Sequence, residues 1–152
     1  MQESPNRNLH PDLHGFLAEF HRINGHPLRA VWHVYVEDCL DKIILEFDLD
    51  SLVVEAEPYD DTIVFSVTGN TDLITSGRID ASHTEPWRSF IGALMGWGWI
   101  TINQQDALDG ILLSFDGIFP QVMLSVMASS IKESNIHQAS RVYREIHPRR
   151  LR

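Results

Sequence analysis

The chain of 152 residues has a single cysteine, Cys39, and no apolar run long enough to cross a lipid bilayer as a helix. One cysteine excludes an intramolecular disulfide framework and a zinc site built from several cysteines. The N-terminal residues do not resemble a signal peptide, because polar residues and Pro11 interrupt them. We therefore expect a cytoplasmic protein in a reducing compartment, with no membrane partner.

The sequence also lacks the short motifs of common enzyme chemistries. It contains no nucleophile elbow, phosphate-binding loop, dinucleotide-binding glycine pattern, zinc-protease helix or EF-hand loop. From this lack we expect no cofactor and no catalytic residue. The sequence favours a binding protein over an enzyme.

Basic residues are scarce in the middle of the chain. Residues 37–85 hold thirteen acids against two bases, Lys42 and Arg78, which is a local net charge of −11 in a chain whose total is −9. Five arginines, by contrast, follow residue 140. An acidic stretch of this size repels nucleic acid and anionic lipid, and it attracts basic proteins. We therefore expect a basic protein partner and no nucleic acid.

Hydrophobic residues make up 43% of the chain, which fits one folded domain over residues 1–152, with loose ends at 1–9 and 147–152. Strand-like alternation and helix-like stripes occupy separate parts of the sequence. We expect an α+β fold in which a mostly antiparallel sheet of about six or seven strands packs against two helices. A third, C-terminal helix is expected at the periphery.

Three segments have helical spacing of apolar residues. One lies between the start signal Glu85-Pro86 and Gly96, and its stripe is Trp87, Phe90, Ile91, Leu94 and Met95. Another runs from near Pro11 to the stop signal Asn24-Gly25, with the stripe Leu13, Phe16, Leu17 and Phe20. The last begins near Asn135, with the stripe Ala139, Val142, Tyr143 and Ile146.

Alternating apolar residues between positions 30 and 68 predict a four-stranded antiparallel meander. Its expected strands are 30–37, 42–49, 51–57 and 62–68. In the first, Ala30, Trp32, Val34 and Val36 form the apolar side. A four-residue loop at 58–61 would place Val54 opposite Phe65, with both in the core. Further strands are expected at 97–102, 111–115 and 121–129, the first two joined as a hairpin.

The meander predicts an acidic surface. A two-residue turn at Asp50-Ser51 would place Glu46 directly opposite Glu55 on the polar face of the sheet. Like charges across a strand pair are destabilising, so either solvent screens them or a cationic partner binds there. The candidate partner-binding residues are Glu46, Asp48, Glu55, Glu57, Asp60 and Asp61. The alternative is a solvated face that keeps the protein soluble.

A small-ligand site is a second hypothesis of a different class. Its candidate residues are Trp97, Trp99, Asn103, Gln105, Asp106 and Asp109, at the hairpin turn. Amides and carboxylates beside aromatic rings suit a polar ligand. The same residues are also typical of turns, where Asn and Asp bind their own backbone.

Three histidines, His10, His14 and His21, fall on one side of the predicted N-terminal helix and are candidate metal ligands. A solvated histidine face explains the same spacing, and no carboxylate completes a known ligand pattern. The arginines of the C-terminal helix are expected to meet acids of this chain or of a second copy, which would make a homodimer.

The stretch from about residue 30 to residue 130 resembles an uncharacterised family of small bacterial proteins. The resemblance rests on Trp87-x4-Gly92, Trp97-x-Trp99, Asn103-x-Gln105 and the strand ending at Phe115, together with Asp60-Asp61-Thr62 upstream. Where the family carries Gly-Tyr after the Gln, this chain has Asp106-Ala107. The resemblance implies no catalytic residue. It implies a small cytoplasmic domain, comparable in size and charge to the immunity proteins that neutralise toxins.

Overall fold

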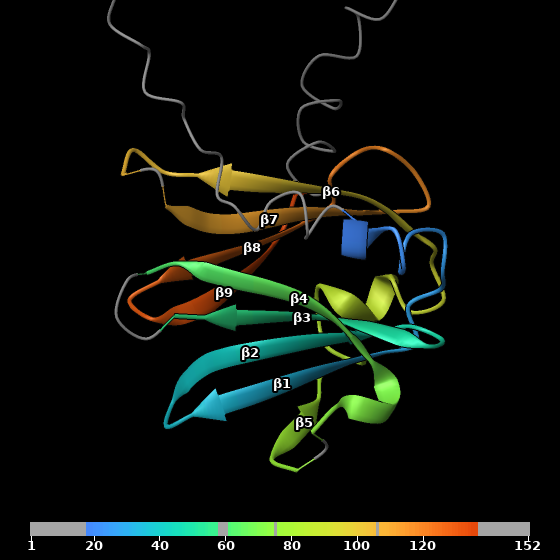
Figure 1. Ribbon diagram of the computed structural model, residues 1–152, viewed down its shortest axis with the longest axis horizontal. Helices are drawn as coiled ribbons and strands as arrows, with labels where there is room; N and C mark the ends of the chain where they lie inside the picture. Colours follow the sequence, from blue (N-terminus) through green and yellow to red (C-terminus); the bar gives the residue numbers. More distant parts are fainter. Residues whose placement is uncertain (1–17, 58–60, 75, 106, 137–152) are drawn as a thin grey trace, which may run out of the picture.

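The computed structural model describes residues 18–57, 61–74, 76–105 and 107–136. These residues form two antiparallel sheets packed face to face (Figure 1). The strands are β1 (Ala30–Val36), β2 (Cys39–Glu46), β3 (Asp50–Ala56), β4 (Ile63–Gly69), β5 (Arg78–Asp80), β6 (Met95–Ile102), β7 (Leu108–Phe115), β8 (Val122–Met127) and β9 (Ser130–Asn135). One sheet has the order β4-β3-β2-β1-β5 and the other β6-β7-β8-β9.

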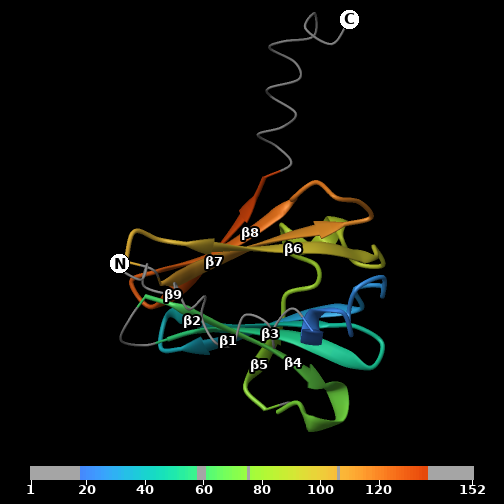
Figure 2. The same cartoon turned by 45° about the horizontal axis from the view of Figure 1, so that its top comes forward.

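The predicted α+β fold is therefore wrong: the described residues form a β-sandwich. Figure 2 shows the two layers, with β6 to β9 above β1 to β5. The helical structure in the described part of the chain is limited to the turn at Ala18–Phe20 and two 3-10 turns, η1 (Asn70–Asp72) and η2 (Trp87–Ser89). The sequence suggested two helices against one sheet, whereas a second sheet covers the first.

The core lies between the sheets and follows the two-residue period of the strands. Its fully buried members include Val31, Ile43, Leu45, Leu52 and Val54 from one sheet and Ile111, Leu113, Val122 and Leu124 from the other. Because neighbouring residues in a strand point to opposite faces, this alternation is what specifies the inner face of each sheet.

One predicted register of the meander is confirmed and the other is wrong. Val54 pairs with Phe65, as expected. In the β2–β3 pair, however, Leu45 pairs with Leu52 and Glu55 pairs with Lys42 instead of Glu46. The shift preserves the faces, because it moves the pairing by an even number of residues. Asn70 fixes the longer turn: its side chain donates to the Phe47 carbonyl at 2.8 Å.

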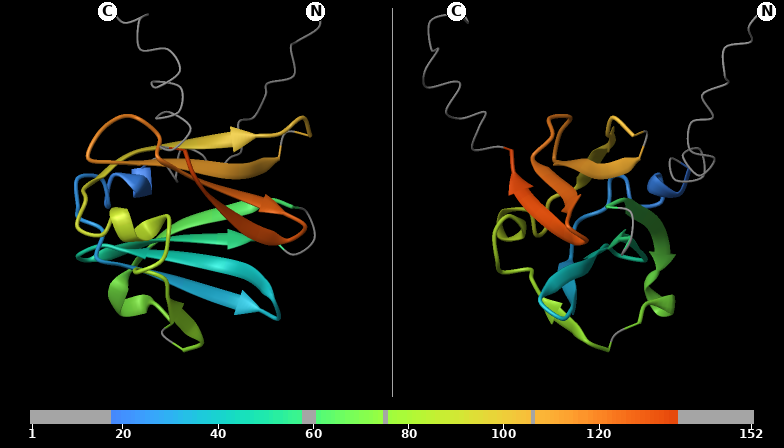
Figure 3. Two further views of the ribbon diagram at one scale, coloured as in Figure 1. Left: turned by 180° about the vertical axis from the view of Figure 1, so that it is seen from behind. Right: turned by 90° about the vertical axis from the view of Figure 1, so that its left-hand side faces the viewer.

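The buried side of β1 is not its apolar side. Val31 and His33 face the core, whereas Trp32 lies on the outer face of the sheet and is only half-buried. Ile44 and Val53 share that outer face and are buried without belonging to the central core. The connection from β4 to β5 joins the two edges of the sheet, on the side away from β6 to β9 (Figure 3).

The expected helix from Trp87 to Met95 does not form beyond the η2 turn. Trp87 and Met95 are buried, but Ile91 and Leu94 are exposed, so the stripe is not one face of a helix. Gly92 has a φ of +87°, which ends the turn. The following residues instead make hydrogen bonds to residues 26–28, such as Leu28 N to Ala93 O at 2.9 Å.

The remaining predictions have mixed outcomes. The β6–β7 hairpin is confirmed, and the strand expected at 121–129 is β8, but the sequence did not predict the further strand β9 that follows it. Asn135 ends β9 and does not start a helix. The described helical turn ends at Phe20, before the predicted stop at Asn24-Gly25, and Gly25 has a φ of +79° at the end of the turn that follows. Residues 1–17 and 137–152, which carry most of the two terminal helix predictions and the predicted dimer contact, lie outside the described residues.

Candidate functional site

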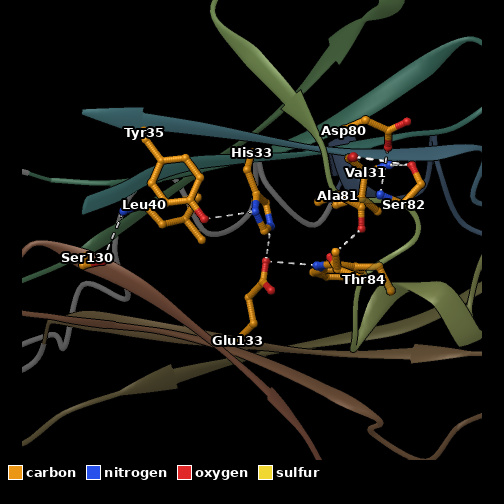
Figure 4. Close-up of polar contacts among 11 residues, drawn as sticks. Val31, His33, Tyr35, Leu40, Asp80, Ala81, Ser82, Thr84, Ser130 and Glu133 are labelled. Atoms are coloured by element: carbon orange, nitrogen blue, oxygen red, sulfur yellow. Dashed lines mark hydrogen bonds and ion pairs between the residues drawn. The ribbon is translucent and has the colours of Figure 1, made fainter. Parts of the chain in front are cut away.

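A buried polar cluster links the two sheets. His33 Nε2 of β1 is hydrogen-bonded to Glu133 Oε1 of β9, and Trp87 Nε1 donates to the same oxygen at 2.9 Å. Tyr35 Oη lies 3.5 Å from His33 Nδ1, and the two rings meet edge to face (Figure 4). The side chains of His33 and Glu133 are 11% and 12% exposed. We call these four residues the inter-sheet cluster.

The chemistry of the inter-sheet cluster is that of a structural link. Buried polar groups are costly unless paired, and here one carboxylate oxygen accepts from both an imidazole and an indole. The carboxylate is thus occupied by the protein's own donors. Tyr35 is the exposed member, at 44%, and marks where the cluster reaches the surface.

A second polar cluster ties the chain after β5 to β1. Ser82 Oγ accepts from Val31 N at 2.9 Å, and Ser82 N donates to Asp80 Oδ1 at 2.8 Å (Figure 4). Hydrogen bonds from the Ser82 side chain and then from its backbone amide lower the pKa of Asp80, because they favour the charged carboxylate. This cluster positions the segment that leads to the buried Trp87.

The predicted acidic face is divided by bases of the same chain. Lys42 Nζ lies 2.9 Å from Glu55, and Arg29 Nε lies 2.7 Å from Asp48. Glu46 is half-buried opposite Ser51, so the predicted Glu46–Glu55 pair does not exist. Asp60 lies outside the described residues.

Acids gather instead with apolar residues at one end of the sandwich. There the β1–β2 turn, the β3–β4 connection and the β8–β9 turn lie side by side (Figure 1, left). Ser129 N donates to Asp61 Oδ1 at 2.8 Å, and Leu40 N donates to Ser130 Oγ at 3.2 Å, which joins the three connections. We call this surface the turn end. Its exposed residues include Tyr35, Val36 and Met127, with the acids Glu37, Asp38, Glu57 and Asp61.

The residues of the predicted small-ligand site are mostly engaged in turn chemistry. Asn103 Oδ1 accepts from the backbone amides of Gln105 at 2.8 Å and Ala107 at 3.2 Å. Asp109 Oδ1 accepts from Thr101 Oγ1 at 2.6 Å. Trp97 is exposed near the start of β6, whereas the turn follows the end of that strand, so the structure separates the aromatic ring from the amides. Asp106 lies outside the described residues.

The predicted metal ligands are only partly described. His21 is exposed on the turn after Phe20, while His10 and His14 lie outside the described residues. Within the described ranges, no three residues among His, Cys, Asp and Glu are grouped as metal ligands would be.

Comparison with known proteins identifies the family to which the chain belongs. A model of the family of unknown function DUF6334 matches residues 15–140. The chain belongs to this family. The resemblance to an uncharacterised family is thus confirmed, and it extends beyond the residues that first indicated it. No curated protein and no solved structure matches the chain.

Sequence patterns did not indicate the central residues of this DUF6334 structure. His33 stood on the mixed side of a strand, and Glu133 fell between two predicted elements, so neither pattern indicated a buried pair. Their contact spans 100 positions in sequence, and only the packing of β9 over β2 creates it. In the described part of the chain, no helix has the length and apolar character of a membrane span.

Proposed function

We propose that this protein is a non-catalytic binding module that holds a basic protein partner at the turn end. The observation that carries the proposal is the combination of exposed Tyr35, Val36 and Met127 with a rim of exposed carboxylates. Interfaces typically have an apolar centre that is desolvated and a polar rim that sets partner choice.

Three features of the turn end support this assignment. His33 of the inter-sheet cluster contacts the Tyr35 ring edge to face and lies near its hydroxyl group. These contacts position Tyr35 as an aromatic anchor. The neighbouring turns carry positive φ values at Glu37, Asp61 and Ala128, which fixes their shape. The nearest base on β2, Lys42, is paired with Glu55, so the rim keeps its negative charge.

The opposite end of the sandwich is the matched comparison. It also exposes apolar residues, such as Phe119 at 73% and Ile118 at 62%. Two of its acids, however, are paired with arginines, Asp50 with Arg22 and Asp48 with Arg29, and Asp116 accepts a hydrogen bond from Leu94 N. The charge layout therefore favours the turn end for a basic partner.

The proposal also covers the cellular compartment of the protein and its functional class. An exposed free thiol, Cys39, suits the reducing cytoplasm. Bacterial immunity and antitoxin proteins are small acidic domains that bind a basic protein without catalysis. We assign the chain to that class.

The test is quantitative affinity capture from the source organism followed by binding measurements on the captured partner. We expect Glu37→Gln combined with Asp38→Asn to weaken binding several-fold and to flatten its dependence on salt, because rim charges act through long-range attraction. Met127→Ser is expected to weaken binding without changing the salt dependence.

Two controls carry equal changes elsewhere. Asp72→Asn combined with Glu85→Gln removes the same charge from exposed positions outside the turn end, and Phe119→Ser removes an apolar residue from the opposite end. Both are expected to leave affinity unchanged. If the control pair weakened binding as much as the turn-end pair, or if no protein were captured at all, the proposal would be wrong.

A further inference from the structure

The proposed function does not explain the surroundings of one basic residue, Arg78. It lies in β5 opposite Val34 of β1, on the same outer face of the sheet as Trp32. Its guanidinium carbon lies 4.0 Å from the centre of the Trp32 ring, in a cation–π stack. The stack holds the guanidinium flat and leaves the edges that carry its N–H donors for other groups.

Two donors of this stack are buried and unpaired. Arg78 Nη1 and Trp32 Nε1 are each shielded from solvent, and neither has a hydrogen-bond partner among the described residues. A buried N–H group without an acceptor is costly, and the guanidinium is always charged. Two such donors on stacked side chains indicate a place for an acceptor.

The acids near Arg78 are engaged elsewhere. Asp80 is two positions along the same strand and thus on the same face, but its carboxylate accepts from Ser82 N. Glu55 lies further across the sheet and is paired with Lys42. Within the described ranges, Arg78 therefore has no ion pair, although the surrounding sequence is strongly acidic.

We propose that Arg78 and Trp32 bind a small oxyanion, either a phosphate or a carboxylate. The guanidinium supplies the charge and a charge-assisted hydrogen bond, and the indole N–H supplies a second, neutral donor. The site is separate from the turn end and takes a ligand of opposite charge from the proposed partner.

Nuclear magnetic resonance of the indole N–H groups tests the site on the intact chain. The Trp32 signal is assigned by its loss in Trp32→Phe, and sodium phosphate and sodium acetate are titrated separately against sodium chloride at equal ionic strength. We expect a saturable shift of the Trp32 signal with phosphate or acetate and none with chloride. The stronger of the two distinguishes a phosphate from a carboxylate ligand.

Variants separate binding from folding. Arg78→Gln is expected to remove the saturable shift, and Arg78→Lys, which keeps the charge but loses the planar fork, to weaken binding about tenfold. The Trp97 and Trp99 signals report whether each variant is folded. Should Arg78→Gln not fold, Trp32→Phe, which keeps an aromatic ring, is expected to weaken anion-dependent thermal stabilisation. A shift as large with chloride, or one unchanged in a folded Arg78→Gln, overturns the proposal, as does full stabilisation of Trp32→Phe.

Discussion

At the scale of single residues, the Glu133 side chain connects segments that are far apart in the sequence. Its Oε1 atom accepts from His33 on the facing sheet and from Trp87 in the connection before β6. One carboxylate therefore joins three segments that are distant in sequence. Such a group stabilises a fold only while its partners are present, because each partner is buried and would otherwise lack an acceptor.

We predict that Glu133→Ala lowers the free energy of unfolding by about 2–5 kcal/mol, because it leaves two buried donors unpaired. Glu133→Gln keeps one amide oxygen for Trp87 and is expected to cost less. Urea unfolding followed by tryptophan fluorescence measures both. The control is Glu55→Ala at the more exposed pair with Lys42, for which we expect a loss of about 0–1 kcal/mol. Equal losses for Glu133→Ala and Glu55→Ala would contradict the structural role of the cluster.

Asp80 gives a prediction on pH. Its folded-state pKa is lowered by Ser82, so the charged carboxylate contributes stability above its unfolded-state pKa, and this is lost as the pH falls through the folded-state pKa. Because Asp80 is exposed, the contribution is at most about 1 kcal/mol. We expect Asp80→Asn to lower the unfolding temperature at neutral pH, with a difference from the original chain that shrinks on acidification. A difference in unfolding temperature that grew towards acid pH would contradict this prediction.

At the scale of elements, the alternation of apolar residues specified faces better than pairings. The pattern identified β1 to β4 and the β6–β7 hairpin, because period-two burial is a local property of sequence. It could not specify the β2–β3 register. That register depends on Asn70 and Arg29, which lie outside the turn and donate hydrogen bonds to residues in it. It also misassigned residues 87–95, where buried side chains fall at helical spacing but the backbone pairs with residues 26–28.

Glycine contacts test the described packing of β6. A Cβ atom at Gly96 would collide with the Gly117 carbonyl and the Ser114 side chain, whereas one at Gly117 would meet nothing within 4 Å. We predict that Gly96→Ala destabilises the protein by about 1–3 kcal/mol and that Gly117→Ala changes stability by less than about 0.5 kcal/mol. Thermal unfolding of the two variants measures the contrast. Equal midpoints would show that β6 does not approach the β7–β8 loop as described.

At the scale of the whole molecule, two features decided what the sequence alone could reveal. The acidic stretch was visible in the charge count, but its distribution was not, because Lys42 and Arg29 divide it only after folding. The last strand of the second sheet, β9, was missed because it follows β8 after the two-residue turn Ala128-Ser129. Turn residues there have positive φ values, an uncommon conformation for Ala and Ser.

The gathering of three connections at the turn end is likewise a property of the sandwich and not of any one segment. Antiparallel strands of similar length return their connections to the same two ends, so residues near 36, 61 and 128 meet. The molecule therefore has two ends with exposed apolar residues, and their charge differs. The functional proposal depends on that difference.

Hydrogen–deuterium exchange of the chain, alone and bound to its captured partner, tests this proposal most directly. The account predicts that binding slows exchange at residues 35–41 and 127–130, and leaves residues 116–121 unchanged. Protection confined to residues 116–121 and the start of β6, with none at the turn end, would contradict it.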